Sequence, residues 1–134
     1  MHTTNYQATL ITPSPDCPTS CGQRPAKPGT VAALQYELLA AAPHTMTSDD
    51  LLWAVDCARK GGDVADPVAR AAFFARPMAC LRASPLVKTL GWALHHDAAG
   101  RVALVDPATA EFGALSARAD LTRLPGMRSA RTKG

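Results

Sequence analysis

The sequence lacks long apolar runs and a strong excess of charge of either sign. No stretch of its 134 residues approaches the ~20 consecutive apolar residues that a membrane-spanning helix needs, so we expect no membrane-embedded segment. The N-terminus has neither the basic start nor the apolar core of a secretory signal. The formal net charge of +3 does not demand a polyanionic partner. Together these absences predict a cytoplasmic protein that works away from membranes.

Cysteines are few. The four thiols are Cys17, Cys21, Cys57 and Cys80. Thiols stay reduced in the cytoplasm, so we expect no disulfide framework. Cys17 and Cys21 are spaced as CxxxC, but zinc sites usually combine two closely spaced pairs of ligands, and the sequence offers no second pair. We therefore predict no metal site and no cofactor.

Complete catalytic motifs are also missing. The sequence contains no glycine-rich phosphate loop, no GxSxG and no HExxH. The adjacent acids Asp49 and Asp50 resemble a catalytic carboxylate pair. Their position at the start of a predicted helix already explains them, because carboxylates there stabilise the helix dipole.

The composition is that of one globular domain spanning residues 1–134. Its hydrophobic content is 47% and its charged content 19%, which is typical of folded chains. The expected elements, in chain order, are a strand at 4–12, a proline-rich irregular loop at 13–30, helices at 31–42, 47–62 and 66–76, a short strand at 78–83, a helical turn or a simple connection at 84–91, a hairpin at 91–106 and a helix at 106–117. This order predicts an α+β fold, in which three to four helices cover a small, mostly antiparallel sheet made of the N-terminal strand and the central hairpin.

Side chains that suit helix starts support the helix predictions. Thr30 precedes the first helix, Thr47 or Ser48 the second, and Asp66 the third. Each can accept a hydrogen bond from a free backbone N–H of the first turn.

Two adjacent histidines, His95 and His96, lie in the predicted hairpin. A three-residue loop that ends in a left-handed Gly100 pairs His96 with Val102. Neighbouring side chains of a strand point to opposite faces, so the two imidazoles cannot bind one metal ion as a pair. We expect His96 on the larger apolar face, either as a structural residue with a hydrogen-bond partner or as a base or ligand in a cleft.

We expect His95 on the opposite face, beside Ala93 and Ala103. The small side chains there make a flat surface that another helix or another subunit can approach closely. The chain is therefore a possible homo-oligomer.

The best candidate for a binding site lies just before the hairpin. If that segment is extended, Cys80, Arg82 and Ser84 project from one face and can hold an anionic ligand. Trp92 and His96 complete a cleft if they fold over the same side. We favour a binding or interaction module without catalysis, and the alternative is a small enzyme or anionic-ligand-binding protein that uses this cleft.

The C-terminal end is basic. Its charged residues are Arg118, Asp120, Arg123, Arg128, Arg131 and Lys133. No aromatic side chains alternate with them, as a base-stacking surface would require. We expect residues 126–134 to form a mobile, solvated tail and expect no nucleic-acid partner.

Several short motifs carry a resemblance to a known family. They are DCP at 16–18, LQYELL at 34–39, TSDDLLW at 47–53, CLRASPL at 80–86 and GWALHHDAAGRVAL at 91–104. Together they resemble a family of small uncharacterised bacterial proteins, a domain of unknown function. The resemblance covers nearly the whole chain and implies a bacterial, intracellular, stand-alone domain, with no activity, substrate or catalytic residue to carry over. Cys21 lies outside these motifs, which argues further against a CxxxC metal site.

Overall fold

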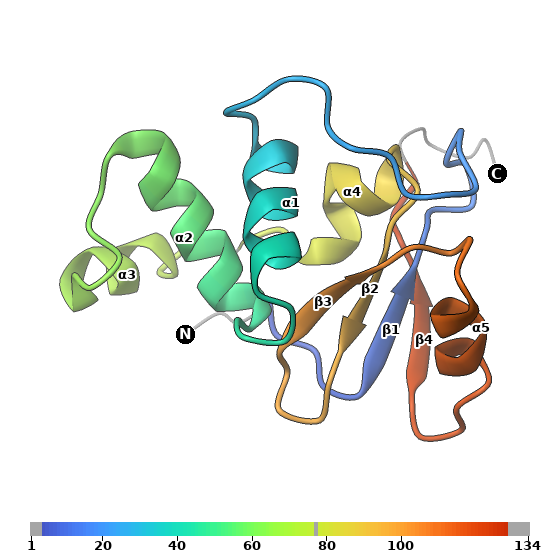
Figure 1. Ribbon diagram of the computed structural model, residues 1–134. Helices are drawn as coiled ribbons and strands as arrows, with labels where there is room; N and C mark the ends of the chain where they lie inside the picture. Colours follow the sequence, from blue (N-terminus) through green and yellow to red (C-terminus); the bar gives the residue numbers. More distant parts are fainter. Residues whose placement is uncertain (1–3, 77, 129–134) are drawn as a thin grey trace, which may run out of the picture.

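A computed structural model describes residues 4–76 and 78–128 (Figure 1). The fold is α+β, as the sequence predicts, and four strands form one sheet in the order β3-β2-β1-β4. The strands are β1 (Thr9–Thr12), β2 (Ala93–His96), β3 (Val102–Val105) and β4 (Thr122–Pro125). The described helices are α1 (Val31–Ala41), α2 (Ser48–Lys60), α3 (Pro67–Phe73), α4 (Pro85–Lys88) and α5 (Ala110–Ser116). The pairings of β1 with β2 and of β2 with β3 are antiparallel, which confirms the predicted core of the sheet.

Strand β4 is a strand that the sequence does not predict, and it pairs in parallel with β1 in a sheet whose other two pairings are antiparallel. Most of its side chains are exposed, so the sequence shows no alternating apolar pattern there. Backbone hydrogen bonds hold it in place. The N–H of Thr122 donates to the carbonyl of Ala8 at 2.9 Å, and the N–H of Gly126 to that of Thr12 at 2.8 Å. The predicted tail is therefore anchored at its first residue, and residues 129–134 lie outside the described part of the chain.

The hairpin has the predicted register, with His96 opposite Val102. The N–H of Asp97 donates to the carbonyl of Arg101, and the N–H of Gly100 to that of Asp97, both at 3.0 Å. Gly100 has a φ of +82°, which glycine adopts without steric cost. The two adjacent histidines of β2 consequently face opposite sides of the sheet, as expected.

The segment before the hairpin is helical, so the predicted strand at 78–83 is wrong. Leu81–Ala83 form a turn of 3-10 helix, and α4 follows directly. Ser84 ends the first element and begins the second, because its Oγ accepts a hydrogen bond from the N–H of Leu86. Pro85 at the first helical position favours this start.

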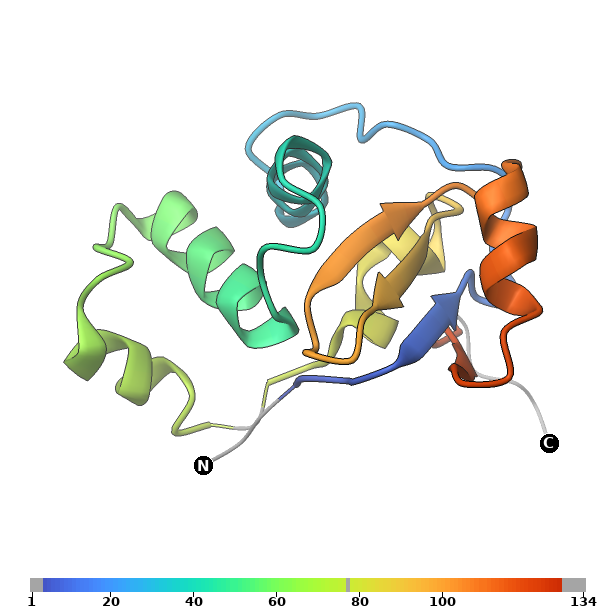
Figure 2. The same ribbon diagram turned by 60° about the horizontal axis from the view of Figure 1, so that its bottom comes forward.

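Helices pack on both faces of the sheet. On one face, Ile11 and Leu94 belong to a core that includes residues of α1, α2 and α4. On the other face, Leu10 and Ala93 pack with Leu115 of α5. Helix α5 lies on the side of the molecule opposite to α2 and α3 (Figures 1 and 2). It occupies part of the small-residue face where the sequence predicts an approaching helix or subunit.

The predicted helix caps are confirmed. Thr30 accepts a hydrogen bond from the N–H of Ala33, and Asp66 from the N–H groups of two residues in α3. For α2 the cap is Thr47, and Ser48 is the first helical residue. The loop at 13–30 is irregular, as expected, and is tied to the fold by backbone bonds such as that from Ser14 N–H to the carbonyl of Val87.

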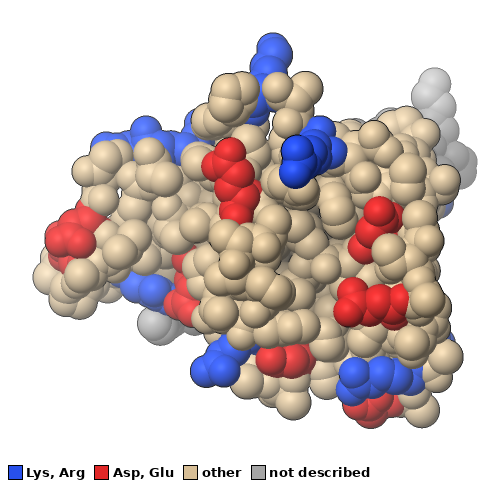
Figure 3. All heavy atoms as spheres, in the orientation of Figure 1, with Lys and Arg blue, Asp and Glu red and all other residues tan. Residues whose placement is uncertain are grey.

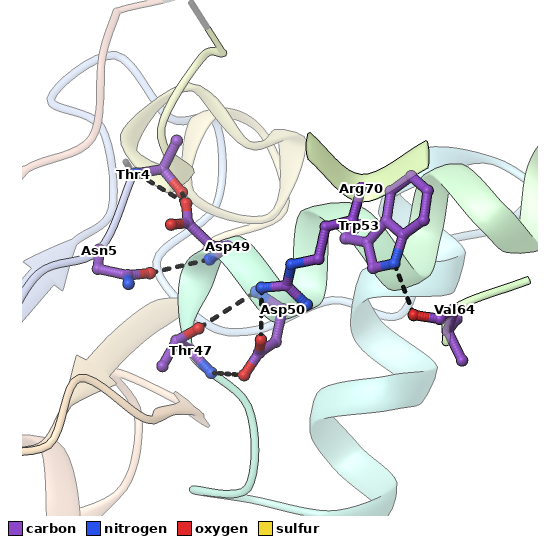
Figure 4. Close-up of polar contacts among 8 residues, drawn as sticks. All are labelled: Thr4, Asn5, Thr47, Asp49, Asp50, Trp53, Val64 and Arg70. Atoms are coloured by element: carbon purple, nitrogen blue, oxygen red, sulfur yellow. Dashed lines mark hydrogen bonds and ion pairs between the residues drawn. The ribbon is translucent and has the colours of Figure 1, made fainter. Parts of the chain in front are cut away.

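Asp49 and Asp50 both serve the start of α2 (Figure 4). Asp50 and Thr47 form a capping box, in which each side chain accepts a hydrogen bond from the other's backbone N–H at 3.2 Å. Asp49 accepts hydrogen bonds from the N–H and hydroxyl of Thr4, at 2.8 and 2.7 Å. The N–H of Asp49 in turn donates to the side chain of Asn5 at 2.9 Å. The structural interpretation of this acidic pair is thus confirmed.

Helices α2 and α3 extend away from the sheet (Figures 1 and 2). Arg70 of α3 donates to Asp50 of α2 at 2.8 Å, and the indole N–H of Trp53 in α2 donates at 2.9 Å to the carbonyl of Val64 in the connection between the two helices (Figure 4). Trp53 also centres a small apolar cluster separate from the cores on the two sheet faces.

Candidate functional site

The five residues of the predicted cleft lie in different surroundings. Cys80 and Ser84 line a small cavity of about 140 Å³. The thiol of Cys80 accepts a hydrogen bond from the hydroxyl of Tyr6 at 3.2 Å. Arg82 donates through Nε to the carbonyl of Pro125 at 2.7 Å, so part of its guanidinium anchors the end of β4.

Ser84 is committed to structure. Its hydroxyl donates to Oε1 of Gln35 at 2.6 Å and accepts from the N–H of Leu86 at 3.1 Å. The side chains of Ser84 and Gln35 are both buried. Because the segment is helical, Cys80, Arg82 and Ser84 do not project in the row that an extended strand would give.

Trp92 belongs to another part of the molecule, beneath the proline-rich loop. Its indole N–H donates to the carbonyl of Gln23 at 2.9 Å, and its ring lies 5.6 Å from that of Tyr36 in α1. Gly22 of the loop packs so closely that an added Cβ would come within 2.6 Å of the Trp92 ring. The indole of Trp92 therefore contacts this loop and α1, and the five-residue cleft stays a prediction.

His96 is fully buried under the helices. Its Nε2 lies 3.1 Å from the hydroxyl of Ser48, and its ring meets that of Tyr6 edge-on at 5.5 Å. Burial, and secondly the neighbouring His95, lower the pKa of His96 to about 4. These contacts agree with a structural histidine that remains neutral near pH 7.

His95, on the other face of the same strand, belongs to a histidine pair. Its Nδ1 lies 2.9 Å from Nε2 of His44, and the two rings meet edge-on at 5.0 Å. His44 comes from the connection between α1 and α2 and has a φ of +56°, which is unusual for a residue with a Cβ. Its N–H donates to the carbonyl of Val102 at 2.9 Å, which fixes this connection to the edge of β3.

The histidine pair lines a pocket of about 390 Å³. Its lining residues are Pro43, His44, His95, Ala103, Leu104, Val105, Glu111 and Leu115. Pockets that bind small molecules commonly have this size and combine an apolar wall with a few polar groups. Here the polar groups are the two imidazoles and the carboxylate of Glu111.

The pair has hydrogen-bonding capacity to spare. His95 is 8% exposed, and its Nε2 is buried without a partner in the described structure. Burial, and secondly His44, lower the pKa of His95, which favours its neutral form. When both rings are neutral, each carries one N–H proton, and one of these two protons lies between the rings. Of the two outer nitrogens, one is then a donor and the other an acceptor.

His44 and Glu111 are not among the candidates predicted from the sequence. No local pattern connects His44 with His95, since 51 positions separate them. The available indication was weak: a flat, small-residue face around His95 with room for another element.

Comparison with known proteins places the chain in a family. A model for a family of unknown function, DUF6157, matches residues 1–132. The chain belongs to DUF6157. No curated protein and no solved structure matches this DUF6157 chain.

Two properties of the described residues bear on the class of site. They contain no group of three or more His, Cys, Asp or Glu arranged to hold a metal ion. None of the helices there has the length and apolar character that crossing a membrane requires.

Proposed function

We propose that this DUF6157 chain is a small-molecule-binding module and that its ligand occupies the pocket between β3, α5 and His44. The observation that carries the proposal is the buried, unpartnered Nε2 of His95 in a histidine pair that lines a pocket of about 390 Å³. Buried polar atoms without partners are uncommon in folded proteins, and one beside a pocket indicates a site at which a ligand or water completes the hydrogen bonding.

The pocket also supplies a hydrophobic wall. Leu104, Val105 and Leu115 contribute apolar surface, while the polar groups are those of the histidine pair and Glu111. This division suits a ligand with an apolar body and a polar head. Reversible binding without catalysis is the simplest function that these groups support.

A bacterial cytoplasmic setting is part of the same proposal. The motif resemblance supports it, and so do the four free cysteines, which suit a reducing compartment. Self-association remains a prediction, to be tested by sedimentation over a range of concentrations.

A fragment screen followed by NMR tests the binding site. The probes are small cyclic molecules with different polar heads, and the imidazole signals of His44 and His95 and the methyl signals of Leu104 and Leu115 are followed. We expect at least one fragment to shift these signals in a saturable way. His44→Asn should weaken its binding about tenfold, because asparagine tolerates a positive φ but does not reproduce the imidazole pair.

Arg82→Ala is the matched control, because it alters the other predicted cleft. Binding that survives Arg82→Ala and is weakened by His44→Asn supports the proposal. Binding that is abolished by Arg82→Ala and unaffected by His44→Asn would assign the ligand to the Cys80 cleft and overturn it.

A further inference from the structure

Among the described residues that line the pocket there is one carboxylate and no lysine or arginine. Glu111, in the first turn of α5, is the acidic residue of the lining, and the remaining polar residues are the two histidines. Within the described part of the chain, Glu111 forms no ion pair and no side-chain hydrogen bond. A ligand in this pocket therefore meets a negative charge that the protein does not neutralise.

The cations on this side of the molecule are directed elsewhere. Arg118 binds both carboxylate oxygens of Asp120, at 2.9 and 2.6 Å. Arg101 contributes to lowering the pKa of Asp97, and neither arginine lines the pocket. An anionic ligand would have to be desolvated beside Glu111 with no lysine or arginine among the described lining residues to pair with it, which is unfavourable.

The surface charge agrees with this assignment. Figure 3 shows that the face between α1 and α5 is largely uncharged, that acidic side chains border it on the α5 side, and that basic side chains lie farther up and down from them. Acidic groups around an uncharged area attract cations and repel anions during approach.

The residues that line the pocket also limit which class of cation can bind there. Quaternary ammonium groups are usually bound by aromatic rings, and the pocket has aliphatic side chains where such a cage would need tryptophan or tyrosine. A primary or secondary ammonium carries N–H groups, which the carboxylate of Glu111 and a ring nitrogen of the histidine pair can accept. Burial lowers the pKa of His95 and favours its neutral form, so His95 does not add a competing positive charge.

We propose that the ligand is a protonated amine with a compact apolar body, whose ammonium group binds Glu111 and the histidine pair while its body packs on Leu104, Val105 and Leu115. This inference rests on the proposed binding function and specifies the chemical class of the ligand.

Three probes of nearly the same shape test the class. They are cyclohexylmethylamine, its N,N,N-trimethyl derivative and cyclohexanecarboxylate, each titrated at pH 7 with the NMR signals of the pocket as the readout. We expect the primary amine to bind at least tenfold more tightly than either of the others. Its affinity should fall as salt is added, because the ion pair with Glu111 is near the surface.

Glu111→Gln removes the charge and keeps the shape. It should weaken binding of the amine about fivefold and leave cyclohexanecarboxylate no weaker than before, while Glu37→Gln on α1 serves as the matched control. If Glu111→Gln binds the amine as well as the unmodified protein does, the proposal of a cationic ligand is wrong. It is also wrong if the carboxylate probe binds more tightly at the same pocket signals. Either result leaves the proposed binding site unaffected. If none of the three probes shifts the pocket signals, the binding function is overturned as well.

Discussion

The two faces of the sheet bury neighbouring histidines in different ways. On the face covered by α1, α2 and α4, His96 is fully buried and hydrogen-bonded to Ser48. On the face covered by the seven-residue α5, His95 reaches the exposed His44 and lines a pocket. The difference shows that the amount of covering structure, and not the residue type, separates a core histidine from a candidate ligand-binding histidine.

Truncation of His96 should produce the largest effect. His96→Ala leaves a cavity in a fully buried site and removes the ring contact with Tyr6. We expect a loss of about 4 kcal/mol in the free energy of unfolding, similar to other large-to-small changes in cores. Urea unfolding at pH 7.5 measures it. A loss below about 1 kcal/mol would show that His96 is not part of the packed core.

Acid should destabilise the protein through the same residue. The pKa of His96 is about 4 in the folded state and about 6.5 in an unfolded chain. Between these values the unfolded state binds a proton that the folded state does not. The free energy of unfolding therefore falls as the pH drops below about 6.5, and the total loss approaches about 3 kcal/mol at pH 4.

The variant His96→Phe isolates this contribution from that of the carboxylates. Urea unfolding of both proteins at pH 7.5, 5.5 and 4.5 should give a shallower pH dependence for the variant. Parallel pH dependences would mean that His96 is protonated in the folded state, contrary to its lowered pKa.

Ser48→Ala should have an intermediate effect. Nδ1 of His96 already lacks a partner in the described structure, and the substitution removes the partner of Nε2 as well. A buried polar atom left without a hydrogen bond costs roughly 1–3 kcal/mol, and we expect about 2 kcal/mol by urea unfolding. Thr45→Ala is a suitable control, because its hydroxyl is exposed and bonds a nearby backbone carbonyl. Equal losses in the free energy of unfolding of the two variants would show that the hydrogen bond to His96 stabilises the fold no more than an exposed one does.

Local sequence patterns were enough to predict that the two histidines lie on opposite faces of the sheet. The alternation of a strand places the two histidines on opposite faces, and the turn residues up to Gly100 set the hairpin register. The helix caps followed from side chains that accept hydrogen bonds, such as Thr30. Each of these features depends on residues that are close together in the sequence.

The parts that could not be predicted depend on distant contacts. Strand β4 is held by backbone bonds to β1, so its exposed side chains leave no pattern. Gln35 is a polar residue on the buried side of α1. Its burial is possible because its side chain accepts a hydrogen bond from Ser84, 49 positions away in the sequence. The position of His44 beside His95 likewise depends on how the connection after α1 attaches to β3. For this reason the sequence indicates Cys80 and Arg82 as candidates and does not reveal the histidine pair.

His44→Asn should have the smallest effect on stability and so sharpen the contrast between the faces. His44 is exposed, and its loss leaves Nδ1 of His95 facing the space that the His44 ring occupied beside the pocket, where water can replace the missing partner. Asparagine tolerates the positive φ of this position, so backbone strain should not increase. We expect a loss of about 1 kcal/mol or less by urea unfolding, in line with one solvent-accessible hydrogen bond. A loss as large as that of His96→Ala would instead mean that the histidine pair is a structural element of the second face, and the pocket would lose its main argument as a binding site.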